Sequence, residues 1–164
     1  MKTSAAVSDR LSLELIKVEM ESAYKEEAFE ELVDLLVRAG KVKDRARAIA
    51  AILEREEQQS TGIGDSVAVP HGKDESIPEL LCALGMSRSG IEFDALDGRK
   101  AHVIFLVLAE AHNPGPHVAL LAGISRLLTR PGFIRRLREA PAPERALAVI
   151  REAEEEVEES EVLP

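Results

Sequence analysis

One histidine of this sequence lies among residues that suit it for chemistry. His71 follows Pro70 and precedes Gly72, and a turn containing Gly62 and Gly64 lies just before it. Proline fixes the backbone before the ring, and the glycines leave the ring little steric cover. An accessible imidazole, with a reference pKa of about 6.5, is mostly unprotonated at neutral pH and can act as a nucleophile. A turn histidine without a role is the alternative, and these neighbours alone leave both open.

Two other side chains could stabilise a group transferred to His71. A phosphoryl group carries diffuse negative charge, which is best held by an arginine, a second histidine or the free N–H groups of a helix N-terminus. Arg55 is expected at the end of the helix that leads into the Gly-rich turn. His117 is expected in the first turn of a helix that follows Pro116. Taken singly, each is more simply explained as a surface charge or an ordinary residue of a helix terminus.

Other chemistries lack their residues. The Gly62-x-Gly64 pair follows a predicted helix and opens a predicted strand, the reverse of a dinucleotide-binding loop, and the P-loop, serine nucleophile-elbow and HExxH motifs are absent. His112 and His117 are separated by Asn-Pro-Gly-Pro and do not share a helix face. Cys82 is the single cysteine. We therefore expect neither a metal site nor a cofactor.

The elements before His71 are predicted to be two helices and a short strand. Apolar residues at helical spacing stop at Gly40, a typical residue just after a helix. Asp44 is placed to cap a second helix that extends to about Gln59. Pro70 is expected to end the short strand after the Gly-rich turn.

The elements after His71 are predicted to be strands and then helices. Residues 80–86 and 101–109 are near-continuous apolar runs, typical of strands covered on both faces, and residues 91–98 between them indicate a hairpin or loop. Helices are then expected over 117–128 and after two prolines, Pro131 and Pro143. These elements predict an α/β fold: a single three-layer α/β/α sandwich with a mixed central sheet flanked by helices.

Length and charge limit the classes of partner. The 164 residues, 45% of them hydrophobic, suffice for one domain, and the net charge is -9. Residues 151–161 hold seven Glu and one Arg, a net of -6, which leaves about -3 for the remainder. Such a chain has no basic surface for nucleic acid, and no apolar run long enough for membrane insertion. We expect a cytoplasmic protein with one domain over 8–150 and an acidic helix end or tail over 151–164.

Several motifs together resemble a known family. Arg55-Glu56, Ser60 to Gly64 and Val67 to Lys73 are similar to the active-site signature of the type-2 (fructose/mannitol-type) IIA proteins of the bacterial phosphoenolpyruvate:sugar phosphotransferase system. Further similar segments follow in the same order, namely 90–98, 103–108, Asn113, His117 and 120–128. The resemblance covers roughly residues 8–150 and is greatest to the nitrogen-regulatory IIA proteins of this family.

The resemblance implies a site and a donor. It implies that His71 is phosphorylated on the ring nitrogen farther from the backbone, and that His117 and Arg55 flank the phosphoryl group. The residues expected to surround the phosphoryl group are Thr61, Gly62, Gly64 and Gly72. The donor would be a phosphohistidine on an HPr-like phosphocarrier protein, with no cofactor. Such a chain is one component of a histidine-to-histidine phosphoryl relay and not a free-standing enzyme.

Three functions remain open. The first is a regulatory phosphocarrier, acting in nitrogen regulation and signal transduction, whose two forms bind different target proteins. The second is a IIA component of a fructose- or mannitol-type transport system that passes its phosphate to a cysteine of a IIB protein. The third is a binding module in which His71 is never phosphorylated.

Two details bear on the resemblance. Asp65 and Ser66 stand where family members often have Asn or Gly, and a carboxylate near the phosphate would oppose its charge. Asp65 therefore either points away or makes the phosphorylated state less stable. Apolar candidates for a rim around His71 are Ile63, Val69 and Ile91.

Overall fold

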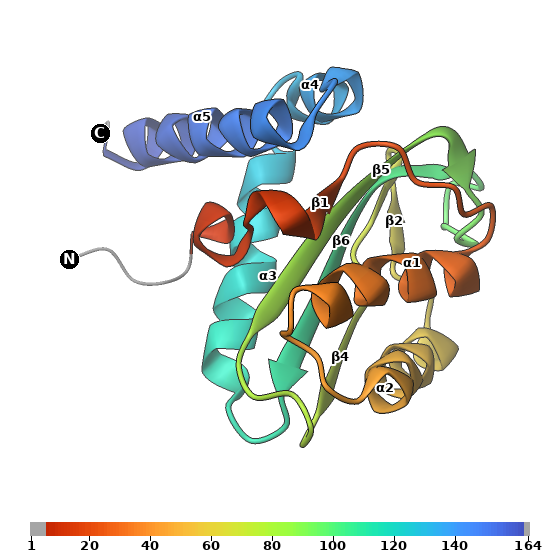
Figure 1. Cartoon of the computed structure of the whole chain (residues 1–164). Helices are drawn as coiled ribbons and strands as arrows, with labels where there is room; N and C mark the ends of the chain where they lie inside the picture. The colour runs from red at the N-terminus through yellow and green to blue at the C-terminus, as the bar shows by residue number, and fades with distance from the viewer. Residues whose placement is uncertain (1–5, 163–164) are drawn as a thin grey trace.

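A six-stranded mixed sheet forms the middle layer of the computed structural model, which describes residues 6–162 (Figure 1). Residues 1–5 and 163–164, the latter the end of the predicted acidic tail, lie outside the described residues. The strand order is β1-β5-β6-β3-β2, and β4 also pairs with β6. The predicted mixed sheet is confirmed, because β5 runs antiparallel to β6 whereas β3 and β4 run parallel to it.

The two long apolar runs form the central strands. They span Leu81–Ile91 in β5 and Ala101–Glu110 in β6, and most of their side chains are buried. The loop between them contains Gly98 with a φ of 71°. The shorter strands are β1 (Ile16–Lys17), β2 (Gly62–Gly64), β3 (Val67–Ala68) and β4 (His71–Asp74).

Helices cover both faces of the sheet, as predicted. Two lie on one face, α1 (Lys25–Arg38) and α2 (Arg45–Gln58), and three on the other, α3 (Pro114–Leu128), α4 (Phe133–Glu139) and α5 (Pro143–Val162) (Figure 1). Asp44 caps α2 as expected, since its carboxylate accepts the N–H of Arg47. The acidic residues after 151 belong to α5. Within residues 6–162, none of the helices has the length and apolar character that crossing a bilayer requires.

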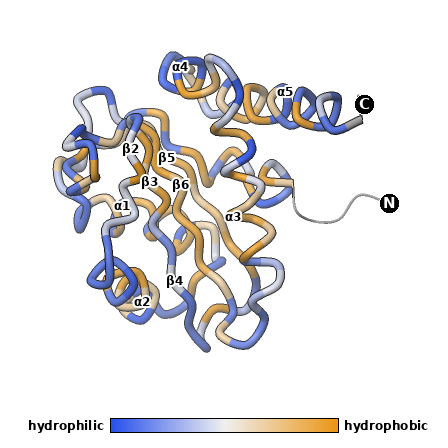
Figure 2. The backbone as a smooth tube through the Cα atoms, turned by 180° about the vertical axis from the view of Figure 1, so that it is seen from behind, coloured by the Kyte–Doolittle hydropathy of each residue, from blue (hydrophilic) through white to orange (hydrophobic). Residues whose placement is uncertain are grey.

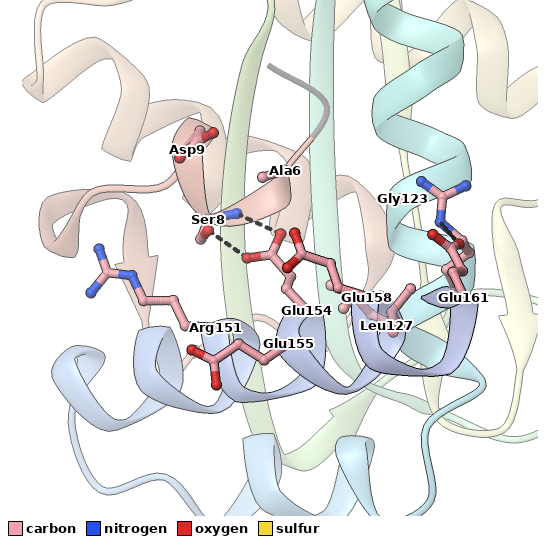
Figure 3. Close-up of a pocket in the computed structure, with 12 residues that line it drawn as sticks. Ala6, Ser8, Asp9, Gly123, Leu127, Arg151, Glu154, Glu155, Glu158 and Glu161 are labelled. Atoms are coloured by element: carbon pink, nitrogen blue, oxygen red, sulfur yellow. Dashed lines mark hydrogen bonds and ion pairs between the residues drawn. The ribbon is translucent and has the colours of Figure 1, made fainter. Parts of the chain in front are cut away.

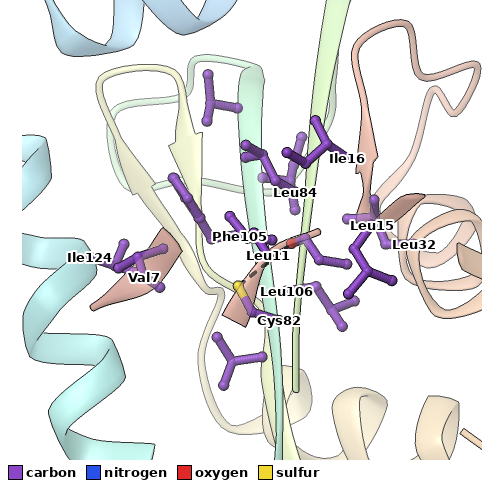
Figure 4. Close-up of a cluster of buried hydrophobic side chains, with 14 of the residues drawn as sticks. Val7, Leu11, Leu15, Ile16, Leu32, Cys82, Leu84, Phe105, Leu106 and Ile124 are labelled. Atoms are coloured by element: carbon purple, nitrogen blue, oxygen red, sulfur yellow. Dashed lines mark hydrogen bonds between the residues drawn. The ribbon is translucent and has the colours of Figure 1, made fainter. Parts of the chain in front are cut away.

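The core lies between the sheet and the helix layers, where the chain is most hydrophobic (Figure 2). Two 3-10 turns, Val7–Arg10 (η1) and Leu13–Leu15 (η2), add side chains to it. In one part of this core Leu15 lies near Leu32 of α1, and Cys82 lies at the centre (Figure 4). Aliphatic residues dominate, but all four phenylalanines are fully buried.

Two short strands, β3 and β4, lie on either side of Val69 and Pro70, and both pair with β6. Pro70 follows the end of β3, as expected, but a second strand begins at once with His71. Both strands pair with β6, and the carbonyl of Pro70 accepts the N–H of Val107 at 3.0 Å. Proline has no N–H to leave unpaired at this junction. His71 is therefore a strand residue held by long-range pairing, and not part of a free turn.

Candidate functional site

His71 and His117 lie side by side although they are far apart in the sequence. Their ring centroids are 5.5 Å apart and the rings meet edge to face at 67°. Successive side chains of a strand point to opposite faces. Gly72 faces α2, so His71 faces the other side of the sheet, where α3 begins. Pro114 starts α3 and places His117 in its first turn, as the sequence predicts.

The ring of His71 is oriented by the backbone two residues before it, between β3 and β4. Its Nδ1 lies 2.8 Å from the carbonyl oxygen of Val69. A carbonyl only accepts hydrogen bonds, so in the neutral ring the proton belongs on Nδ1. Nε2 then carries the free lone pair, and it is the nitrogen farther from the backbone.

The surroundings of both imidazoles favour the neutral form, because they lower the pKa of each ring. Burial lowers the pKa of His71, and the nearby charge of Arg55 acts in the same direction, whereas the hydrogen bond to Val69 and the charge of Glu56 oppose them. Burial also lowers the pKa of His117, helped by His71 and Lys73. The rings therefore stay unprotonated to a lower pH than free imidazole does, and both keep a lone pair.

His117 carries an unused polar atom. Its Nε2 is buried and has no hydrogen-bond partner within residues 6–162. Leaving such an atom unpaired costs about 1–3 kcal/mol, so native proteins seldom do it without a reason. A polar group arriving between the two histidines would relieve this cost. A phosphoryl oxygen fits this position chemically.

Arg55 lies close enough to His71 for its charge to affect the ring. It belongs to the last turn of α2, and one of its guanidinium nitrogens donates to the carbonyl of Gln59 at 2.9 Å. The remaining donors of the guanidinium suit a tetrahedral anion. α2 can approach β4 closely because Gly72 has no side chain, as a Cβ there would lie 2.8 Å from the carbonyl carbon of Ala51.

The other predicted site residues lie at different distances along the β2–β3 hairpin. Thr61 is opposite Val69, because its carbonyl accepts the Val69 N–H at 3.0 Å. Gly62 pairs with Ala68 and is packed against the next loop, where an added Cβ would lie 3.0 Å from the Cβ atoms of both Phe93 and Ala95. Gly64 is at the far end of the hairpin. Strand pairing thus places Thr61 opposite Val69, two residues before His71, and Gly64 opposite Val67, four residues before it.

Asp65 lies at the turn of this hairpin. Asp65 and Ser66 have φ values of 53° and 72°, and the N–H of Asp65 donates to the carboxylate of Asp97 at 3.0 Å. Gly64 pairs with Val67, four residues before His71, which is about 13 Å along an extended chain. That exceeds the screening length of about 8 Å in physiological salt. Of the two possibilities left open for Asp65, this placement favours a carboxylate that lies away from His71.

Two charged residues of the matched segments, Glu56 and Lys73, were given no role from the sequence. Glu56 is 7% exposed and accepts both the N–H and the hydroxyl of Thr61, at 2.9 and 2.5 Å. The sequence does indicate the burial of Glu56, because it lies four residues after Ile52 and both therefore face the inside of α2. Lys73 is exposed on β4, and its charge affects His117.

The apolar rim differs from the predicted one. Ile63 is 56% exposed and Val69 is partly buried, but Ile91 is fully buried at the end of β5. The suggestion that Ile91 belongs to the rim is therefore wrong. Val118 is 64% exposed and directly follows His117, so it is apolar surface beside the site.

The remaining histidines have the ordinary roles of strand and surface residues. His102 lies on β6 and its Nδ1 contacts the carbonyl oxygen of Ser87 at 2.9 Å. His112 is exposed and lies 3.4 Å from a carboxylate oxygen of Glu75. Among residues 6–162, no group of three or more potential metal ligands comes together.

A cavity of about 410 Å³ is lined by residues that include neither His71 nor His117. Figure 3 draws the side chains that line it. The cavity is bounded by η1, the end of α3 and α5, and its lining includes Ser8, Arg126 and Glu154. The side chain and N–H of Ser8 both donate to Glu154 and fasten η1 to α5. None of the predicted site residues lines this cavity.

Comparison with known proteins identifies the family. The model of the family described as phosphoenolpyruvate-dependent sugar phosphotransferase system, EIIA 2, matches residues 10–153. The chain belongs to this family. It is therefore a type-2 IIA phosphotransfer protein. The resemblance seen in the sequence is confirmed.

Relatives of this EIIA chain carry two kinds of name. A fructose-specific EIIA component from Haloferax volcanii is 37% identical over 91% of the chain and 97% of that protein. A nitrogen regulatory protein from Escherichia coli is 30% identical over 93% of each chain. A fructose-specific EIIABC component from Bacillus subtilis is 36% identical over 89% of the chain, but the chain spans only 23% of that longer protein.

A solved structure supports the same fold. The nitrogen regulatory protein IIA-Ntr from Neisseria meningitidis aligns with a TM-score of 0.81 and 28% identity, over 88% of this chain and 98% of its own. The predicted α/β sandwich is thus confirmed by an experimentally determined relative.

Proposed function

We propose that Nε2 of His71 accepts a phosphoryl group from a phosphohistidine of an HPr-like carrier and that the phosphorylated protein passes on or signals that state. The observation that carries this proposal is the hydrogen bond from Nδ1 of His71 to the Val69 carbonyl at 2.8 Å. It leaves Nε2 as the free nucleophile beside the unpartnered Nε2 of His117.

The transfer is a displacement between two imidazoles. The lone pair of His71 Nε2 forms a bond to phosphorus as the N–P bond of the carrier breaks, and that electron pair returns to the carrier ring. The proton on Nδ1 of His71 stays in its hydrogen bond to Val69. Because one N–P bond replaces another, the step is readily reversible, which suits a relay.

Three groups are placed to stabilise the transferred phosphoryl oxygens. Arg55 supplies a guanidinium held by the carbonyl of Gln59, and His117 supplies a ring nitrogen. The first turn of α3 supplies the backbone N–H of Gly115, because Pro114 and Pro116 have none. Neither a nucleotide nor a metal takes part in this scheme.

A regulatory role is supported by the negative charge that phosphorylation of His71 adds to the surface. Phosphorylation adds between one and two negative charges at neutral pH, beside exposed apolar residues such as Val118. A protein that binds the neutral surface will therefore bind the phosphorylated surface differently. The similarity to nitrogen regulatory proteins of Neisseria meningitidis and Escherichia coli supports this form of the function.

A second candidate is a IIA component of a fructose- or mannitol-type transport system. The 37% identity to the fructose-specific EIIA component of Haloferax volcanii favours it. In that case the phosphoryl group would pass from His71 to a cysteine of a IIB protein. The two candidates share the first transfer and differ in the second.

The intact mass of the protein after incubation with phosphoenolpyruvate, enzyme I and an HPr-like carrier tests the shared step. Wild type and the His112→Ala control should each gain one acid-labile phosphoryl group, and His71→Ala should gain none. Labelling that survives in His71→Ala would assign the site elsewhere. Absence of labelling in wild type with every carrier tried would favour a binding module.

The second step separates the two candidates. Phosphorylated protein is mixed with a fructose-type IIB protein, and loss of label from the chain with gain on the IIB cysteine supports the transport component. Retention of label, together with target proteins that bind only one of the two forms, supports the regulator.

A further inference from the structure

We infer that Glu56 is a positioning residue for His71, acting through Thr61 and Val69. This inference deepens the proposed function and rests on it for the role of His71. Glu56 lies on α2 and is almost fully buried. Its carboxylate accepts hydrogen bonds from Thr61 and forms none with either imidazole in the described residues. Its effect on His71 must therefore pass through the residues between them.

The first link joins α2 to the hairpin. Glu56 accepts the Thr61 N–H with one carboxylate oxygen, at 2.9 Å, and the Thr61 hydroxyl with the other, at 2.5 Å. A carboxylate that accepts two bonds from one residue fixes both its backbone and its side chain. Thr61 is 4% exposed, so water competes little for these bonds.

The second link carries this restraint to His71. The carbonyl of Thr61 accepts the N–H of Val69 at 3.0 Å, and the carbonyl of Val69 accepts Nδ1–H of His71 at 2.8 Å. The position of Thr61 therefore fixes the N–H of Val69, and through it the direction of the Val69 carbonyl. If Thr61 shifts, the Val69 carbonyl turns, and the bond that keeps the proton on Nδ1 weakens.

An ion pair with Lys25 explains how a buried carboxylate is tolerated at position 56. Lys25 of α1 lies 3.4 Å from Glu56 and 3.2 Å from Asp94 in the loop after β5. A buried charge needs such a partner, because burial without one is strongly unfavourable. The negative charge of Glu56 also raises the pKa of His71, against the effects of burial and Arg55.

The test uses variants that keep shape and change one link at a time. Glu56→Gln removes the charge, Thr61→Val removes the hydroxyl, and Thr61→Ser keeps it. Glu57→Gln is the matched control, since Glu57 is exposed on the same helix. Two readouts are compared: the ring ¹⁵N and ¹H resonances of unphosphorylated His71, which report its tautomer, and the rate of phosphorylation by the carrier.

Glu56→Gln and Thr61→Val are expected to raise the share of the Nε2–H tautomer and to slow phosphorylation on the order of 10- to 100-fold, as small misplacements of reacting groups do. Glu57→Gln should behave as wild type, and Thr61→Ser, which keeps the hydroxyl, should lose clearly less than Thr61→Val does. A wild-type tautomer and rate in Glu56→Gln would overturn the inference, as would equal losses in Thr61→Ser and Thr61→Val. If Glu56→Gln fails to fold, the two threonine variants decide.

The two proposals can fail separately. The tautomer of His71 is measured without any carrier, so it tests the role of Glu56 even if the protein is never phosphorylated. A wild-type protein that resists every carrier would contradict the proposed function, whereas a tautomer shift in the variants would still support the positioning role.

Discussion

Gly72 of β4 lies directly against the backbone of Ala51 in α2, where an added Cβ would come within 2.8 Å of the Ala51 carbonyl carbon. The atoms in its way are backbone and not flexible side chain, so the helix itself would have to move. Arg55 and Glu56 lie on the same helix, one turn farther along. The contact therefore links strand packing to the groups beside His71.

Gly72→Ala should lower the free energy of unfolding by about 1–3 kcal/mol, the usual cost of overpacking. It should also slow phosphorylation, because α2 is displaced from His71. Chemical denaturation and the rate of label uptake measure the two effects. Ala50→Ser, at an exposed position on α2, is the control and should change the free energy of unfolding by about 0.5 kcal/mol or less. Equal stability of the two variants would contradict the prediction.

The charge of Arg55 should matter more for transfer than for folding. We expect Arg55→Gln to slow phosphorylation on the order of 100-fold, as loss of one oxyanion-stabilising donor does. Arg55→Lys should recover only part of the rate, because an ammonium lacks the planar fork of a guanidinium. Stopped reactions followed by intact mass give these rates. Arg38→Gln, at an exposed position on α1, should leave the rate unchanged.

The stability of the fold should fall as the pH drops below the ordinary pKa of histidine, about 6.5. Burial lowers the pKa of both His71 and His117, so in this range the unfolded chain binds protons that the folded chain does not. Protons then favour unfolding, and the loss continues until the folded-state pKa values are reached.

Urea denaturation between pH 7.5 and 5.5 checks this pH dependence. The double variant His71→Gln, His117→Gln should lose less stability over the range than wild type does. If both proteins lose the same amount, other groups govern the pH dependence and the histidines do not.

Cys82 should be unreactive in the folded protein. It is fully buried on β5, and burial raises the pKa of its thiol to about 12, so the reactive thiolate is scarce at neutral pH. A thiol reagent such as 5,5′-dithiobis(2-nitrobenzoate) should label it only as the chain unfolds. Rapid labelling under native conditions would contradict the placement of this residue.

Local signals in the sequence predicted most of the fold. The cap at Asp44, the stop at Gly40 and the two apolar runs each act over a few neighbouring residues, and the elements form where they predict. Strand β4 was not predicted, because His-Gly-Lys-Asp has no strand pattern of its own. Its pairing with residues 107–110 of β6 makes it a strand.

The candidate site was predicted in part for the same reason. His71, His117 and Arg55 stand out by residue type, and the structure brings the two histidines together. Glu56 stands among other acidic residues of a charged helix, and only the packing of α1, α2 and β2 shows that it is buried. Charge alone could not separate it from its exposed neighbour Glu57.

Strand β6 fixes both histidines at once. His71 is placed beside Val107 by parallel pairing, whereas His117 follows from the end of the same strand through the short connection to α3. A slip of one residue between β4 and β6 would move His71 about 3.3 Å and turn its side chain to the opposite face. A chain trapped in that mispaired state could keep most of its core and yet have no phosphoryl acceptor, so label uptake would report correct strand alignment during refolding more strictly than helix content does.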